Sequence, residues 1–265
     1  MKGLICYFSG SGNTKLAMQY LTSKIKNIEF ELCNIRKENN PDFKKYELIG
    51  FATYTDFYAP PRYFYSFFEG IKAQHFKYAF VFNTYGCISS DTLQKLKKLA
   101  EMKGFKILSG HSLHCPESYP PMRKSRLTFD FSPNRKELTR FDNFIDNLSI
   151  QIEDIKNNKD PKYVQIKSPI LSYIIQYSRG KAKKDFGIQN INESLCDACG
   201  TCAELCPYKA IRLNPKPIFD HDKCNGCWVC YNHCTRKAIY AKKFRGDFQY
   251  PKPNDKLVKK LSIVQ

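Results

Sequence analysis

Eight cysteines between residues 196 and 234 carry the clearest chemical signal in the sequence. They form two runs with the same C-x2-C-x2-C-x3-C spacing, and the second run repeats the first 28 residues later. Thiolates are soft ligands that suit iron–sulfur clusters, and this spacing is typical of cluster ligation rather than of zinc fingers. The sequence therefore predicts two iron–sulfur clusters, with structural zinc as the alternative. The runs are Cys196, Cys199, Cys202 and Cys206, then Cys224, Cys227, Cys230 and Cys234.

Residues 186–242 resemble a bacterial two-cluster ferredoxin throughout. In such ferredoxins the fourth cysteine of each run ligates the cluster that the other run holds. Thr235 stands where the first run has Pro207, a departure that removes no ligand. The resemblance implies two [4Fe–4S] clusters with exchanged ligands. The first would be bound by Cys196, Cys199, Cys202 and Cys234, and the second by Cys224, Cys227, Cys230 and Cys206.

A second chemical feature lies near the start of the chain, in the segment SGSGNT at residues 9–14. It follows a short apolar run and precedes a segment with helical periodicity. Glycines let backbone N–H groups turn inward, and a helix N-terminus presents unpaired donors with partial positive charge. The segment lacks a P-loop lysine and a G-x-G-x-x-G run, so a terminal monophosphate fits better than a nucleoside triphosphate or a dinucleotide. The alternative is an ordinary turn with a helix cap.

Alternating apolar strands and amphipathic helices must position these groups. This alternation over the first half predicts an α/β fold with a doubly wound, five-stranded parallel sheet. Ligands of such sheets bind at the carboxyl ends of the strands. The expected strands are 3–8, 29–35, 46–53, 78–83 and 105–109, and the expected helices are 14–26, 61–71, 90–103 and 134–155.

Two further loops leave the carboxyl ends of expected strands, at residues 53–61 and 83–89, and both carry tyrosines that could stack on a flat ring. With these loops and the SGSGNT segment, residues 1–150 resemble a flavodoxin. The resemblance implies FMN as cofactor. Its phosphate would be held by Ser9, Ser11, Gly12, Asn13 and Thr14, and its ring flanked by Tyr54, Tyr85 and Gly86.

The segment after the fifth expected strand holds His111, His114 and Cys115, which invite a metal hypothesis. A proline-rich loop near the flavin ring, with Tyr119 as its residue of interest, is the preferred interpretation. Further along, residues 169–175 form a short apolar patch that is too short to span a membrane. It favours a linker helix over a helix lying on a membrane surface.

The expected domains are a flavodoxin-like FMN domain at 1–150, a linker with a short helix at 151–185, a small α+β two-cluster ferredoxin domain at 186–242 and a tail at 243–265. The formal net charge is +18 without a long basic block. Flavodoxins are usually acidic, so their partners do not carry over; we expect an acidic redox partner, no specific nucleic acid and no membrane span. Without an apparent leader, we expect a cytoplasmic protein with reduced thiols.

The combination resembles flavodoxin–ferredoxin fusion proteins of anaerobic microbes. It implies an electron-transfer flavoprotein that passes electrons between two [4Fe–4S] clusters and FMN, without a catalytic side chain. One alternative is an FMN-dependent oxidoreductase that reduces a small substrate, with an open pocket lined by Tyr58, Tyr119 or His114. The other is a redox-sensing module that binds nucleic acid, which dispersed charge disfavours.

Overall fold

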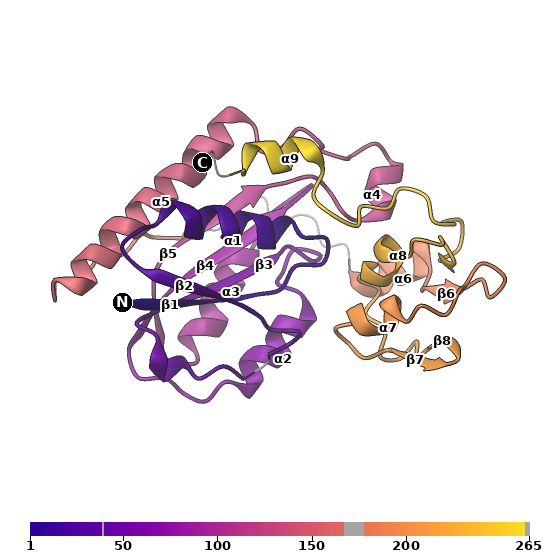
Figure 1. Cartoon of the computed structure of the whole chain (residues 1–265), viewed down its shortest axis with the longest axis horizontal. Coiled ribbons are helices and arrows are strands. Elements are labelled where there is room, and N and C mark those ends of the chain that lie inside the picture. Colours follow the sequence, from indigo (N-terminus) through magenta and orange to yellow (C-terminus); the bar gives the residue numbers. More distant parts are fainter. Residues whose placement is uncertain (39, 167–177, 263–265) are drawn as a thin grey trace. The chain divides into compact units, whose positions relative to one another are not determined.

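A computed structural model of the chain describes residues 1–38, 40–166 and 178–262. The chain divides into two compact units (Figure 1). The first unit comprises Met1–Pro116, Phe129–Ile174 and Pro253–Gln265, and the second comprises Glu117–Thr128 and Ile175–Lys252. No helix among the described residues is long and apolar enough to cross a membrane.

The first unit is built on a parallel sheet. Among the described residues, five strands pair in the order β2-β1-β3-β4-β5, which is the strand order of flavodoxin-like doubly wound sheets. The predicted fold class is therefore confirmed. The strands are β1 (Lys2–Tyr7), β2 (Glu29–Asn34), β3 (Leu48–Tyr54), β4 (Lys77–Tyr85) and β5 (Phe105–His114).

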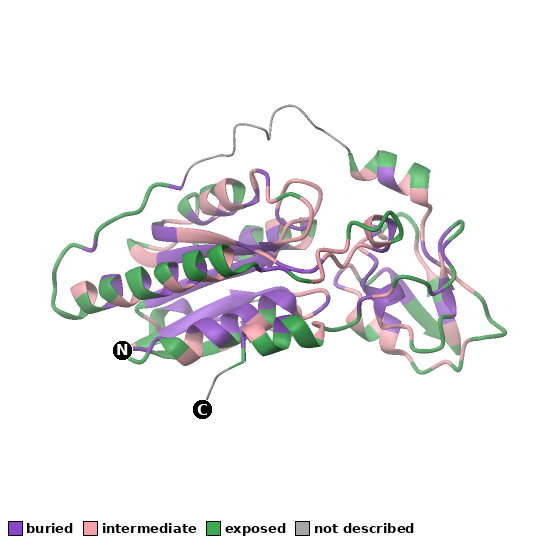
Figure 2. Cartoon of the chain, turned by 90° about the horizontal axis from the view of Figure 1, so that it is seen from above, coloured by how far each residue is buried: buried purple, intermediate pink, exposed green. Residues whose placement is uncertain are grey.

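Helices cover both faces of this sheet, because neighbouring strand residues point to opposite faces. Ile5 of β1 joins a core with the helices α1 (Asn13–Lys24), α5 (Arg135–Lys156) and α9 (Asp255–Lys260). Leu4 and Cys6 join a second core on the other face. That core includes residues of α2 (Arg62–Gly70), α3 (Thr92–Glu101) and the 3₁₀ turn η1 (Phe43–Lys45). Figure 2 shows buried strands between helices whose outer faces are exposed.

The helix α5 begins where its sequence predicts a start. The side chain of Asn134 accepts a hydrogen bond from the backbone N–H of Glu137 (3.0 Å), and the Glu137 carboxylate accepts one from the Asn134 N–H (2.6 Å). This reciprocal capping box satisfies two N–H groups that would otherwise lack partners. It also fixes the position of Glu137 at the start of the helix.

The strand β5 is longer than its apolar run predicts. It continues past Ser109 to His114 and pairs with β4 as far as Tyr85↔His114. The polar residues that suggested a loop are accommodated because Ser112 binds Asn83 of β4 and His111 packs against Phe82 and Phe141. His111 and His114 therefore lie in a strand, and the loop begins only after them.

The second unit is an internal repeat. Helix α7 (Thr201–Leu205) recurs 28 residues later as α8 (Val229–His233). The antiparallel pair of β6 (Asn190–Ile191) with β9 (Ile239–Tyr240) corresponds to the pair of β8 (Lys216–Phe219) with β7 (Ile211–Asn214). The helix α6 (Arg179–Phe186) precedes the repeat. This small α+β arrangement agrees with the expected ferredoxin-like domain.

Two segments lie in a different unit from the one that the sequence suggests. Residues 117–128, with α4 (Pro120–Lys124), were expected inside the flavodoxin-like domain but belong to the second unit. There Tyr119 packs edge-on against Trp228, with 5.8 Å between ring centroids. Residues 253–262 were expected as a tail but belong to the first unit, where Leu257 and Leu261 are buried in the α1–α5 core. The apolar patch at 169–175 lies outside the described residues.

Candidate functional site

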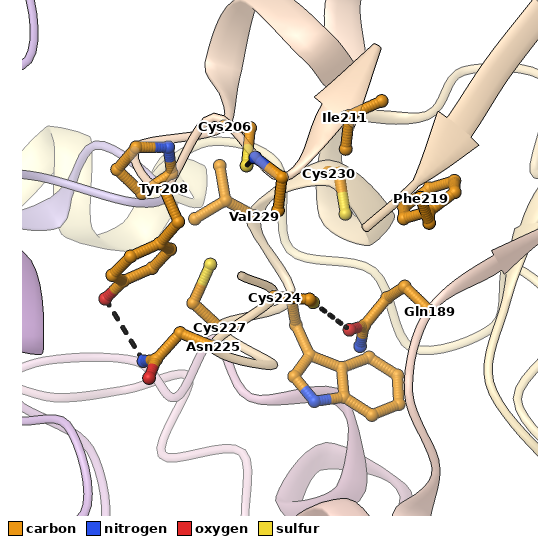
Figure 3. A pocket seen from close by; sticks show the side chains of 13 residues that line it. Gln189, Cys206, Tyr208, Ile211, Phe219, Cys224, Asn225, Cys227, Val229 and Cys230 are labelled. Carbon is orange, nitrogen blue, oxygen red and sulfur yellow. Dashed lines mark hydrogen bonds between the residues drawn. The ribbon is translucent and has the colours of Figure 1, made fainter. Parts of the chain in front are cut away.

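The second unit contains two cavities of similar size that are each lined by four cysteines. The site I cavity and the site II cavity each combine three cysteines of one run with the fourth cysteine of the other. This is the grouping that exchanged cluster ligands require. Figure 3 shows the four cysteines of site II around their cavity. Site I is lined by Cys196, Cys199, Cys202 and Cys234, and site II by Cys206, Cys224, Cys227 and Cys230.

The internal repeat explains this exchange. In each half the first three cysteines lie in the loop before a short helix and in its first turn, and the fourth cysteine immediately follows that helix. Cys202 lies in α7 and Cys206 caps its C-terminal end, so the two thiols leave opposite ends of one helical turn. A five-residue helix is therefore sufficient to send the fourth thiol to the other cavity. The N-cap residue of each helix has a left-handed backbone. It is Gly200 (φ 77°) before α7 and Trp228 (φ 63°) before α8.

Burial disfavours the free thiolate at four of the cysteines that line the two cavities. It raises the pKa of Cys227 to about 12 and that of Cys202 to about 11, and it also raises the pKa of Cys224 and Cys230. A coordinating metal removes the thiol proton because its positive charge replaces the proton. Four thiols around one cavity thus form a donor set that suits an iron–sulfur cluster.

The residues that flank the cysteines carry different charges at the two sites. At site I the guanidinium of Arg236 donates to the carboxylate of Asp197 (2.8 Å) and lowers the pKa of that carboxyl. At site II the repeat places Tyr208 and Asn225 at the corresponding positions, and the Asn225 amide donates to the Tyr208 hydroxyl (3.1 Å). The same contact is therefore an exposed ion pair at site I and a neutral hydrogen bond at site II.

The β1–α1 loop of the first unit presents hydrogen-bond donors at the carboxyl end of β1. Gly12 is the N-cap of α1 with φ 96° and offers no capping side chain. The hydroxyl of Ser9 accepts from the N–H groups of Gly12 (3.1 Å) and Lys15 (3.4 Å). These two donors converge on one acceptor, as a phosphate oxygen at a helix N-terminus requires. The loop thus fits the expected phosphate site.

Two of the residues expected to bind the phosphate also hold the β1–α1 loop in place through side-chain hydrogen bonds. The side-chain amide of Asn13 donates to the carbonyl of Pro116 (2.9 Å), and the Thr14 hydroxyl lies 2.8 Å from the Thr84 hydroxyl. Both side chains are buried. Ser11 is buried as well. The sequence predicts these residues as direct phosphate ligands and gives no sign of their partners, which lie 70 or more residues away.

The residue Thr84 links all three loops that the sequence assigns to a flavin. Its hydroxyl meets Thr14 of the first loop, and its carbonyl accepts from the N–H of Thr55 in the second (2.8 Å). Thr84 itself lies at the end of β4, beside Tyr85 of the third expected loop. Below it, the fully buried Asn83 donates to Thr55 (2.9 Å) and Ser89 (3.2 Å). This network holds the carboxyl edge of the sheet in a defined shape.

The expected ring-flanking residues are half-buried and already engaged. Tyr54 packs against Phe8 with 5.6 Å between ring centroids, and Tyr85 stacks on His114 at 5.0 Å with an interplanar angle of 8°. The His114 Nδ1 lies 3.0 Å from the Glu137 carboxylate. One face of Tyr85 is thus covered by an imidazole, and Gly86 follows it in the same loop. Their role toward a flavin stays a prediction.

The C-terminal segment packs against the β1–α1 loop, a contact that the sequence does not suggest. A Cβ at Gly12 would lie 2.8 Å from Cδ of Pro253. Asn254 holds this segment by capping α9 and donating to the carbonyl of Asp130 (3.0 Å). The presence of proline and asparagine just before an amphipathic segment is the signal that could have revealed a docked helix rather than a tail.

The three residues of the metal hypothesis have separate surroundings. The ring of His111 packs against Phe141 and Phe144, His114 binds Glu137, and Cys115 is buried in the apolar core. Within residues 1–38, 40–166 and 178–262, no group of three or more His, Cys, Asp or Glu side chains is placed to hold a single metal ion.

Comparisons with known proteins find a matching family and a similar ferredoxin. Residues 190–212 match the family described as "4Fe-4S binding domain". A ferredoxin of Pyrobaculum islandicum is 37% identical over 51 residues, which cover 18% of this chain and 48% of that protein. The chain thus spans about half the length of this relative.

Several solved structures are similar to part of the chain. A flavodoxin from the domain Archaea has a TM-score of 0.42 and 16% identity, covering 58% of this chain and 99% of its own. Flavodoxin 1 of Bacillus cereus has a TM-score of 0.40 and 17% identity, with coverage of 55% and 95%. A Lactobacillus acidophilus flavoprotein in complex with FMN has a TM-score of 0.35 and 18% identity, with coverage of 42% and 92%. The chain thus joins a unit with the flavodoxin-like strand order to a unit in which residues 190–212 match a 4Fe-4S binding domain.

Proposed function

We propose that the protein passes electrons between two [4Fe–4S] clusters in its second unit and one FMN in its first unit. The main support is the pair of cavities, each lined by three cysteines of one run and one of the other. A donor set of this kind, repeated twice at a constant offset, is what a two-cluster ferredoxin needs. Site I would hold one cluster and site II the other.

The protein's own residues would bind and shield these groups. The cysteines supply thiolate ligands, while the buried Trp228 and Tyr231 exclude water from the second unit. In the first unit the N–H groups of the β1–α1 loop would bind the FMN phosphate, and Thr84 would fix the spacing of the three loops around it. The clusters exchange single electrons and FMN accepts one or two, so together they connect one- and two-electron partners.

The charge of the chain favours an acidic redox partner. The formal net charge is +18, and about six negative charges would be added by two oxidised clusters and a flavin phosphate at roughly −2 each. The loaded protein would remain basic. Complementary charge mainly raises the rate at which partners meet, and salt screens it. Electron transfer to an acidic carrier should therefore slow as ionic strength rises.

The proposal is tested by anaerobic purification of the whole chain and measurement of its iron, zinc and flavin. We expect about eight irons per chain, four for each cysteine-ligated cluster, together with one FMN. The absorbance should show flavin bands above broad cluster absorbance. Stoichiometric zinc with little iron would contradict the cluster assignment, and iron without flavin would contradict the FMN assignment.

A further inference from the structure

Gln189 is a fully buried polar side chain that lines site II. The thiol of Cys224 lies 3.7 Å from its Oε1 and donates to it, as the dashed line in Figure 3 shows. Its other amide atom, Nε2, is buried and has no hydrogen-bond partner among the residues that the structure describes. A buried N–H group without a partner is costly. Gln189 therefore holds an unused donor at the edge of the cavity.

The internal repeat supplies a natural comparison for this residue. Every residue that lines site I has a counterpart lining site II at the 28-residue offset. The counterpart of Gln189 is Pro217, which lines site I. Proline has neither a side-chain donor nor a backbone N–H. At this position the donor therefore belongs to site II alone. Site I has a different polar contact, because the hydroxyl of Thr201 lies 3.5 Å from the sulfur of Cys199 where site II has Val229.

Two cationic side chains of α6 hold the loop that carries Cys224. The helix α6 places the ammonium of Lys183 on the carbonyl of Cys224, and the guanidinium of Arg179 donates to the carbonyl of Gly226 (2.9 Å). These contacts fix the loop that carries Cys224. The distance between its sulfur and the Gln189 amide is then set by the fold rather than by a mobile loop.

Ligation changes what the Gln189 amide can do. A cysteine bound to iron is a thiolate and has no proton for Oε1, so the contact as drawn would bring two acceptors together. The two ends of an amide are nearly equal in size and are told apart by their hydrogen bonds. A half-turn of the side-chain amide brings Nε2 toward the sulfur and satisfies the unpaired donor.

Resting on the proposed function, we propose that the amide of Gln189 donates a hydrogen bond to the Cys224 thiolate and raises the reduction potential of the site II cluster. Reduction adds negative charge to a cluster, and a donor beside its sulfur stabilises that charge. Hydrogen bonds to cluster sulfurs are a recognised control of cluster potential. Pro217 supplies no donor at the equivalent position of site I, so loss of the Gln189 donor should shift the potential of the site II cluster alone.

The test is Gln189→Met, which keeps nearly the same length but removes the N–H. Anaerobic redox titration of the whole protein, followed by EPR, should resolve two cluster potentials. We expect one of the two cluster potentials to be about 59 mV lower in the variant. This shift corresponds to about a tenfold change in the one-electron equilibrium constant. The other should stay in place. Iron content should remain at about eight per chain.

A matched control is Gln74→Met, the same substitution at an exposed amide of the first unit that binds the carbonyl of Lys72 (2.8 Å) and lines neither cavity. It should leave both potentials unchanged, even where its melting temperature falls. Two unchanged potentials in Gln189→Met, an upward shift, or an equal shift of both would overturn the proposal. Failure of the proposed function would look different, because the wild-type protein would then lack iron or show no second cluster potential.

Discussion

The hydroxyls of Thr14 and Thr84 lie 2.8 Å apart, although 70 residues separate them in the chain. Thr14 belongs to the first turn of α1 and Thr84 to the end of β4. Their contact joins the start of α1 to the end of β4, beside Tyr85. Because the two positions are almost fully buried, water cannot replace either partner.

Replacing Thr84 by valine should weaken FMN binding and leave the clusters intact. The Thr14 hydroxyl would lose its partner in a dry site, which costs about 1–3 kcal/mol. We expect a lower free energy of unfolding by that amount and a raised FMN dissociation constant, measured by flavin fluorescence. Thr22→Val is the control, because its hydroxyl binds the neighbouring turn at an exposed position. Equal FMN affinity in both variants would show that the Thr14–Thr84 contact does not support the flavin site.

Gly12→Ala should disturb the same loop for two separable reasons. A left-handed backbone costs an alanine about 1–2 kcal/mol, and the new Cβ would lie 2.8 Å from Cδ of Pro253. The single variant should therefore lower both stability and FMN affinity. Combining it with Pro253→Ala removes the contacting ring atoms but not the backbone strain. The double variant should be less destabilised than the sum of the two single changes, and strict additivity would show that the C-terminal segment does not restrain the loop.

The fourth cysteines should pair functionally with the opposite run. Cys206→Ser and Cys224→Ser should lose the same cluster, whereas Cys234→Ser and Cys196→Ser should lose the other. Each variant should keep about four of about eight irons, and EPR should show the same surviving cluster within each pair. Cys87→Ser, in the first unit, should keep all the iron. If Cys206→Ser instead resembled Cys196→Ser, each run would ligate its own cluster and the exchanged grouping would be wrong.

His111 should make the first unit sensitive to mild acid. Burial, with a smaller effect of the Arg140 charge, lowers its pKa to about 4, against about 6.5 in an unfolded chain. The folded state therefore binds fewer protons than the unfolded state between these values, so stability falls as the pH falls from about 6.5 toward 4. Between pH 7 and pH 5 the loss should be about 2 kcal/mol.

This dependence is measured by urea unfolding at several pH values. Circular dichroism reports the unfolding of the first unit. His111→Phe keeps an aromatic ring between Phe82, Phe141 and Phe144 but cannot bind a proton. Its stability should change less between pH 7 and pH 5 than that of the wild type. The same slope in both proteins would show that other groups cause the acid sensitivity.

The sequence predicts well those features that depend on residues close together in the chain. The five strands and their helices follow from apolar runs and periodicity, since each segment buries one face on a neighbour. The exchanged grouping of Cys206 and Cys234 is what the resemblance to two-cluster ferredoxins implies. The cavities group the same residues.

The features that the sequence does not reveal depend on partners far along the chain. Tyr119 looks like a loop tyrosine, but its ring packs against Trp228 in the second unit. Pro253 looks like part of a tail, but it packs on Gly12. Thr84 and Gln189 belong to no sequence motif. Their importance becomes visible only because the structure shows that both side chains are buried. Aligning the two halves of the repeat would have placed Gln189 opposite Pro217, although not the unused donor.

Electron transfer within one chain is the central claim, and photochemical injection of single electrons tests it most directly. In the anaerobic protein with both clusters and FMN bound, absorbance can follow the flavin and the clusters separately after a brief light pulse. We predict that the electron moves between flavin and clusters with a first-order rate constant that does not change with protein concentration. A rate proportional to protein concentration, or no exchange between the two absorbances, would contradict the account.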